Sequence, residues 1–283
     1  MADQVAVVTD SSPYLPSHIL DQYPIHVVPL VVIWGEEHYA DGVDITPEEF
    51  YSRLESSEVM PSTSQPSVAD FQQIFQELHH QGFKILAVLL SEQLSGTISS
   101  AVQARKLLPE AEIEIVDSES VAMACGFQVL SAARAAAQGA TLQECKRAAL
   151  RARERSGVIF VLDTLEFLHR GGRIGGAKRF FGTLLKVKPV LAIEDGVVIS
   201  VDQVRTHKKA LERIVEIVQN RTRGHEHVRL ATLHANNRTT AENILEEAAS
   251  IIQPQETFFT EVSPVIGTHA GPGAVGLAYL LDM

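Results

Sequence analysis

The segment Ile85-Leu86-Ala87-Val88-Leu89-Leu90-Ser91-Glu92-Gln93-Leu94-Ser95-Gly96-Thr97 decides the fold class. Its first six residues are all apolar, which is typical of a central strand in a parallel sheet that is covered on both faces. Ser95, Gly96 and Thr97 then open a helical pattern that continues to Leu108. A buried strand that leads directly into a helix predicts a β–α unit of an α/β fold.

Units of the same kind lie on both sides of this segment. Apolar runs at 5–8, 27–34 and 112–116 predict further strands. Helical patterns separate them, at 47–54, 68–80, 97–108, 121–138 and 142–155. This alternation predicts an N-terminal α/β domain, residues 1–156, with a parallel sheet between two layers of helices.

The second half of the chain has a different order of elements. Two predicted strands, 187–193 and 197–204, are joined by Glu194-Asp195-Gly196, and an Asp-Gly pair is a strong signal for a hairpin turn. Predicted strands at 157–162, 228–233 and 257–262 and helices at 208–219 and 240–252 complete it. Residues 157–283 are therefore predicted to form a mixed-sheet α/β domain.

Composition and charge exclude several classes of protein. The 283 residues are 45% hydrophobic and 21% charged, as in an ordinary globular chain. A formal net charge of −11 disfavours binding to nucleic acid. A polar start and the lack of a long apolar run predict a cytoplasmic protein. No histidine or cysteine spacing indicates a metal site, and Cys125 and Cys145 are expected to be buried apolar residues.

Two hydroxyl-rich segments precede predicted helices. Thr63 and Ser64 lie ahead of the helix at 68–80, and Ser95, Gly96 and Thr97 follow the 85–90 strand. In a parallel sheet, ligands bind at the carboxyl ends of strands, and helix N-termini favour anions. Each segment alone is explained by helix capping, but the two together indicate one anion site built from neutral donors.

Two glycine-rich segments complete the candidates. Arg170 to Gly176 resembles a phosphate loop, but Ala177 stands where a P-loop requires lysine, so we interpret it as a recognition loop with two arginines, Arg170 and Arg173. His269 lies between Gly267 and Gly276 in a predicted loop that can approach another domain closely. An anion near His269 is expected to raise its pKa above about 6.5.

Taken in order, these segments resemble the DegV family of bacterial fatty-acid-binding proteins. The matching pieces are Val8-Thr9-Asp10-Ser11-Ser12, Thr63-Ser64-Gln65-Pro66, Leu94-Ser95-Gly96-Thr97, Val116-Asp117-Ser118, Arg170-Gly171-Gly172-Arg173 and Gly267-Thr268-His269-Ala270-Gly271-Pro272-Gly273. Each piece is short, and the specificity comes from their common order along the chain.

The resemblance implies two α/β domains with a long-chain fatty acid such as palmitate buried between them. It implies that Thr63 and Ser95 hold the carboxylate, with His269 close by and Ser64, Gly96 and Thr97 in the same binding segments. It also implies a carrier without a cofactor, which presents the carboxylate to a separate fatty-acid kinase and is not itself an enzyme. Arg170 and Arg173 would then face the kinase or, transiently, a membrane.

Other interpretations remain open at this point. A small-molecule kinase or transferase of dihydroxyacetone-kinase-like architecture would need a nucleotide site and Mg²⁺ ligands, and no acidic cluster with a phosphate loop is evident. Apolar residues of the second half either line the acyl chain or belong to an ordinary core: Leu165, Phe167, Leu168, Phe180, Phe181, Leu184 and Leu185.

Overall fold

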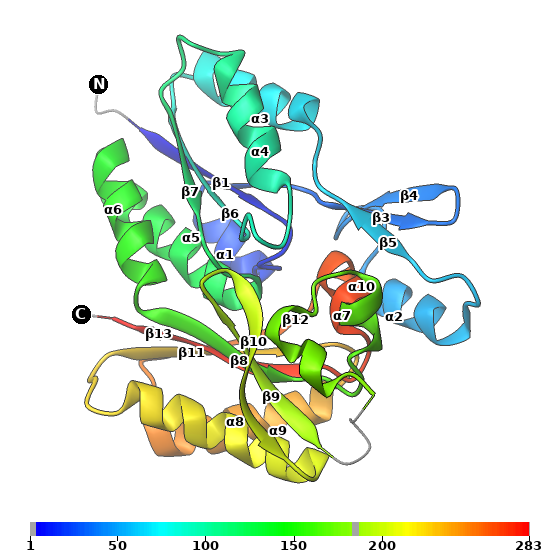
Figure 1. The fold of residues 1–283 in the computed structure, drawn as a ribbon. Coiled ribbons are helices and arrows are strands. Elements are labelled where there is room, and N and C mark those ends of the chain that lie inside the picture. Colours follow the sequence, from blue (N-terminus) through cyan, green and yellow to red (C-terminus); the bar gives the residue numbers. More distant parts are fainter. Residues whose placement is uncertain (1–3, 183–186, 283) are drawn as a thin grey trace.

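A four-stranded sheet forms the first half of the protein (Figure 1), whose computed structural model describes residues 4–182 and 187–282. The strand order is β2-β1-β6-β7, and every pair is parallel. Their bounds are β1 Val5–Asp10, β2 Ile25–Val28, β6 Lys84–Leu89 and β7 Ile113–Asp117. The two central strands, β1 and β6, are almost wholly buried, which confirms the interpretation of the apolar run at 85–90.

Helices cover both faces of this parallel sheet. On one face lie α3 (Val68–His80) and α4 (Thr97–Lys106), and on the other α5 (Ala122–Ala137) and α6 (Leu142–Arg153). Ser67 and Thr141 begin α3 and α6 with capping boxes, in which the cap hydroxyl and a Glu or Asp three residues later satisfy free N–H groups. The three-layer arrangement predicted for the first half is thereby confirmed.

A six-stranded mixed sheet forms the second half, in the order β10-β9-β8-β13-β11-β12. Only β11 and β12 run parallel. The bounds are β8 Ser156–Val161, β9 Lys188–Glu194, β10 Val197–Val204, β11 Val228–His234, β12 Glu256–Glu261 and β13 Val275–Leu281. Asp195 and Gly196 join β9 to β10 with φ angles of 49° and 78°, as a primed hairpin turn requires. The predicted mixed sheet and its hairpin are confirmed.

The helix α5 packs between the two sheets, while α8 (His207–Thr222) and α9 (Arg238–Ile252) cover the far side of the mixed sheet (Figure 1). One continuous apolar core joins residues of α5 to both sheets, among them Val88, Phe127 and Leu191. The predicted division at residues 156 and 157 stays a prediction, because this core includes residues from both sides of it.

The predicted strand at 27–34 is wrong in one respect. The chain forms two strands there, β2 in the parallel sheet and β3 (Val31–Trp34) in a separate one. Pro29 separates them, because proline cannot donate the N–H that a continuous ladder needs. A three-stranded sheet, β4-β3-β5, follows, with β4 at Glu37–Ala40 and β5 at Ser62–Ser64. Thr63 therefore lies on a short strand and not in a loop.

The last strand, β13, is absent from the sequence-based prediction. It lies in the middle of the mixed sheet and pairs with β8 and β11. Its sequence, Val-Gly-Leu-Ala-Tyr-Leu-Leu, is apolar throughout, as a central strand buried on both faces should be.

The short elements α1 (Ser17–Gln22), α2 (Pro47–Ser56), α7 (Glu166–Arg170), the 3₁₀ helix η1 (Gly175–Phe180) and α10 (Pro264–Ala270) complete the described chain. Among the described residues, no helix has both the length and the apolar composition that a membrane span requires.

We predict that Phe127→Ala destabilises the whole fold. The ring is fully buried in α5 and meets Phe258 of β12 edge-to-face at 5.9 Å. Its loss should lower the free energy of unfolding by about 3–5 kcal/mol, because a cavity remains between the sheets. Urea denaturation measures this. Leu107→Ala, at a position 55% exposed, is the control and should change it by less than about 0.5 kcal/mol. Equal effects of the two substitutions would contradict the assigned core.

Candidate functional site

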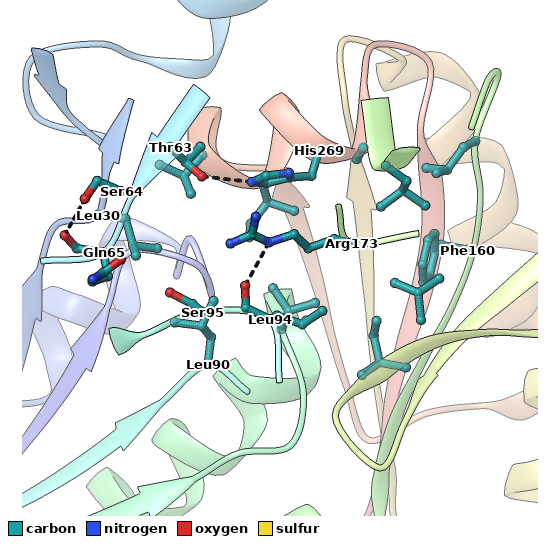
Figure 2. A pocket seen from close by; sticks show the side chains of 18 residues that line it. Leu30, Thr63, Ser64, Gln65, Leu90, Leu94, Ser95, Phe160, Arg173 and His269 are labelled. Carbon is teal, nitrogen blue, oxygen red and sulfur yellow. Dashed lines mark hydrogen bonds between the residues drawn. The ribbon is translucent and has the colours of Figure 1, made fainter. Parts of the chain in front are cut away.

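A cavity of about 100 Å³ lies where loops of the parallel sheet meet the mixed sheet (Figure 2). Its apolar lining comes from both halves of the chain: Leu30, Leu90, Leu94, Val121, Phe160, Leu162, Leu168, Ile193, Val198, Val265, Ile266 and Ala270. Its polar lining is Thr63, Ser64, Gln65, Ser95, Arg173 and His269. Figure 2 shows these polar residues gathered on one side, while Phe160 lies on the other.

Thr63 and His269 meet across this cavity. The Thr63 hydroxyl lies 2.9 Å from Nε2 of His269, although the two residues are 206 positions apart. Thr63 is held on β5 by its pairing with Val32 of β3. His269 lies in the last turn of α10, not in a loop as predicted, because Ser263 caps that helix and Gly271, with φ 74°, ends it.

Ser95 lies in the loop between β6 and α4 and lines the same cavity. Its hydroxyl is 2.9 Å from the hydroxyl of Thr97, which is buried behind it. Gly96 and Thr97 do not line the cavity. Gly96 lies against the side chain of Gln65, where a Cβ atom would approach to 3.2 Å. The structure thus brings Thr63, Ser64, Ser95 and His269 together, with Gly96 and Thr97 just outside.

Capping does not account for these hydroxyls. The cap of α3 is Ser67, not Thr63 or Ser64, and the N-cap of α4 is Gly96, which offers no side chain. The hydroxyl groups of Thr63 and Ser95 therefore do not serve as helix caps.

Arg173 occupies a different place from the one predicted. Its guanidinium donates to the carbonyl oxygens of Leu94 (Nε, 3.0 Å) and Gly171 (Nη1, 2.6 Å) and lines the cavity (Figure 2). Gly172, with φ 72°, turns the chain back after α7, which directs Arg173 inward. Arg170 is exposed instead and pairs with Glu166 at 2.5 Å. The polar side of the cavity therefore holds a fixed positive charge and not only neutral donors.

The His269 ring is close-packed, and its pKa is lowered to about 4. Burial is the main cause, and the positive charge of Arg173 adds to it. Nδ1 has no hydrogen-bond partner among the described residues and faces Gly171, where a Cβ atom would lie 2.1 Å from it. Both effects lower the pKa of the ring, so the rise that a bound anion is expected to cause stays a prediction and would have to overcome them.

Most of the apolar lining was missed by sequence reasoning. Of the seven predicted candidates, Leu168 lines the cavity; Leu165, Phe167, Phe180 and Phe181 do not, and Leu184 and Leu185 lie outside the described residues. A usable signal was the alternation along β8. Ile159 and Val161 pack toward α8, whereas Phe160 and Leu162 point into the cavity.

The arrangement is suited to an apolar molecule with an anionic head. Hydroxyl groups and a guanidinium can hold an anion, and the apolar side chains exclude water around the rest of the ligand. In residues 4–182 and 187–282, no group of three or more His, Cys, Asp or Glu side chains could hold a metal ion. Cys125 and Cys145 are buried free thiols, as predicted.

Comparison with known proteins gives one family for the whole chain. Residues 4–282 match the model of the DegV family, described as uncharacterised proteins. A DegV domain-containing protein of Halalkalibacterium halodurans is 35% identical over 99% of both chains. Protein DegV of Bacillus subtilis is 34% identical over 97% of this chain and 98% of its own length.

Solved structures agree with this result. A DegV family protein of Thermus thermophilus, described with its fatty-acid binding, superposes with a TM-score of 0.93 at 33% identity, covering 99% of this chain and all of that one. DegV of Bacillus subtilis, described as a fatty acid binding protein, gives a TM-score of 0.92 at 32% identity, covering 99% and 100%. The two-sheet architecture is therefore that of solved DegV structures.

We predict that His269 makes the fold sensitive to acid. Its pKa is about 4 in the folded chain and about 6.5 when unfolded, so the unfolded chain binds the proton more readily between these values. The contribution of neutral His269 to the free energy of unfolding is therefore complete above pH 6.5 and is lost as the pH falls toward 4. Between pH 7.5 and 5.0 it should amount to about 2 kcal/mol.

Urea denaturation at the two pH values tests this for wild type and His269→Gln. The variant should lose about 2 kcal/mol less than the wild type on acidification. His225→Gln, at an exposed histidine, serves as the control and should behave like the wild type. An unchanged pH dependence in His269→Gln would show that the ring is not kept neutral by the fold.

Proposed function

This chain belongs to the DegV family, and from that premise we propose that it binds one long-chain fatty acid in the cavity and presents the carboxylate to a separate fatty-acid kinase. One observation carries the proposal: the cavity is apolar except on one side, where Thr63, Ser95, Arg173 and His269 converge. Two relatives with the same architecture are described as binding fatty acids, which supports the choice of ligand. A cytoplasmic carrier that is not an enzyme is part of the same proposal.

The energetics of the two ends of a fatty acid suit the two sides of the cavity. Burial of about 14 methylenes contributes roughly 11 kcal/mol at about 0.8 kcal/mol each, before the costs of association. A buried carboxylate without partners would cancel much of this gain. Arg173 supplies the opposite charge, and the hydroxyls of Thr63 and Ser95 can donate hydrogen bonds to the carboxylate. The head group is therefore stabilised on the polar side of the cavity.

The size of the cavity adds a constraint. Pockets that enclose drug-sized ligands measure about 300–1,000 Å³, whereas this cavity measures about 100 Å³. A long acyl chain therefore needs apolar lining side chains to move apart as it enters. The mixed-sheet residues Phe160, Leu162, Ile193 and Val198 face that space.

The polar side of the cavity favours presentation to another protein. Gln65 lines it and is exposed, so the carboxylate would lie close to the surface. Arg170 is 54% exposed and only three residues from Arg173 in the chain. We assign Arg170 to contact with the kinase or, transiently, with a membrane, and Arg173 to the head group.

We predict that Ser95→Ala and Arg173→Gln weaken binding of a long-chain fatty acid about ten- to hundredfold, because each removes a hydrogen bond to a charged group. Fluorescence titration measures the affinity. The fatty alcohol of equal length is the matched ligand, and its affinity should change far less in Arg173→Gln, since it carries no charge. Ser99→Ala, an exposed serine on α4, is the control. Affinities equal to wild type in both variants would refute this head-group site.

We predict a different result for Arg170→Ala. This variant should bind fatty acid as the wild type does, because the side chain lies outside the cavity lining. With ATP and the fatty-acid kinase of the same organism, it should form acyl phosphate more slowly at limiting carrier. Arg151→Ala, another exposed arginine, should leave the rate unchanged. A chain that loses its fatty acid on the Arg170 substitution would overturn the division between the two arginines.

A further inference from the structure

We propose that Asp41 is a positioning residue for the cavity, whose carboxylate ties the start of α10 to the loop after β1 and so sets the place of His269. The inference rests on the proposed function for its consequence in binding. It concerns the segment Thr9-Asp10-Ser11-Ser12, which does not line the cavity but is hydrogen-bonded to two residues that do, Leu30 and Leu90.

Hydrogen bonds to the Asp41 carboxylate join distant parts of the chain. It follows β4 and is 2% exposed. Its Oδ2 accepts a hydrogen bond of 2.5 Å from the Ser11 hydroxyl, and its Oδ1 accepts one of 3.3 Å from the backbone N–H of Val265. Val265 is the second residue of α10 and itself lines the cavity. One carboxylate thus connects β4, the loop after β1 and the helix that carries His269.

Ser11 extends these hydrogen bonds toward strands β3 and β5, the second of which carries Thr63. Its hydroxyl oxygen accepts the backbone N–H of Leu30 at 3.1 Å, and the backbone N–H of Asp41 donates to the Leu30 carbonyl at 2.8 Å. Leu30 lines the cavity and precedes β3, to which Thr63 is paired through β5. The donors all lead toward the Asp41 carboxylate. The Leu30 N–H donates to the Ser11 oxygen, and the Ser11 hydroxyl and the Val265 N–H donate to Asp41.

Asp10, next to Ser11, connects this segment to the loop that carries Ser95. Its Oδ2 accepts the backbone N–H of Leu90 at 2.7 Å, and its Oδ1 accepts that of Ser12 at 2.9 Å. Leu90 begins the loop that carries Ser95. The three segments that bring Thr63, Ser95 and His269 together are therefore held by two adjacent residues, Asp10 and Ser11, and by Asp41.

The charge of Asp41 is costly where it stands. Among the described residues, no lysine or arginine forms an ion pair with it, and burial raises its pKa to about 7. The groups that face it add no cation: Asp10 raises the pKa further, hydrogen bonds from Ser11, Ser263 and Val265 lower it, and Tyr14 and Tyr51 are the other titratable neighbours. The folded chain therefore binds this proton more tightly than the unfolded chain, so ionisation of Asp41 destabilises the fold as the pH rises toward 7.

Because the buried charge of Asp41 destabilises the fold, a positioning role of this residue can be distinguished from a role in stability alone. Asparagine at position 41 removes the buried charge, so the free energy of unfolding at pH 8 should be unchanged or higher. It also replaces one carboxylate oxygen by an NH₂ donor. An NH₂ group cannot accept the Val265 N–H, and if it faces Ser11 instead, the serine hydroxyl has to turn so that it accepts and no longer donates to position 41. In either case one of these two hydrogen bonds is lost or reversed, and α10 is held less firmly relative to β5.

The test compares Asp41→Asn with Asp44→Asn. Asp44 is the matched control, because it lies in the same turn and its exposed carboxylate accepts the backbone N–H of Ala40. In Asp41→Asn, affinity for a long-chain fatty acid should fall about tenfold or more, and backbone amides of α10 should exchange with deuterium faster. Stability at pH 8 should not fall. Asp44→Asn should match the wild type in all three measurements.

A second variant, Ser11→Ala, keeps the test decisive if Asp41→Asn does not fold. It removes the hydroxyl between Leu30 and Asp41 and should also weaken binding and accelerate exchange in α10. Wild-type affinity and exchange in the variants would overturn the proposal, as would a loss of affinity that only follows a loss of stability. If the wild type itself binds no fatty acid, the proposed function fails, and exchange in α10 alone then decides whether Asp41 positions the helix.

Discussion

The positive charge of Arg173, on the polar side of a largely apolar cavity, is the interaction on which the candidate site depends. Arg173 is held there by the carbonyl oxygens of Leu94 and Gly171, so it cannot swing freely to solvent. Burial of the ring, together with the charge of Arg173, lowers the pKa of His269 and keeps it neutral, and His269 in turn meets Thr63. An anion is attracted to such a place, while the apolar walls beyond it suit only a hydrocarbon.

The fold brings this site together from residues that are remote in sequence. Thr63 lies on a three-residue strand, Ser95 in a loop after a central strand, Arg173 in a turn and His269 at the end of a short helix. None of these elements is long enough to be stable alone, so their places depend on the sheets behind them. The buried hydrogen bonds of Asp10, Ser11 and Asp41 hold these short elements in place around the cavity.

The sequence predicts best where one local pattern decides the structure. The apolar run at 85–90 is typical of a buried strand and forms one, and Asp195-Gly196 matches the turn that joins β9 to β10. It predicts less well where tertiary contacts decide. Pro29 divides one apolar run between two sheets, and the place of β13 in the middle of the mixed sheet depends on its pairing with β8 and β11. Whether Arg173 points inward depends on the backbone at Gly172, a single φ angle that composition does not reveal.

Mass spectrometry of an organic extract of the purified, denatured protein tests the central claim most directly. We expect close to one equivalent of free long-chain fatty acid per chain, retained through purification because the tail is buried and the head group is paired. A protein that carries no fatty acid and takes none up from solution, or one that releases a bound nucleotide instead, would contradict the account.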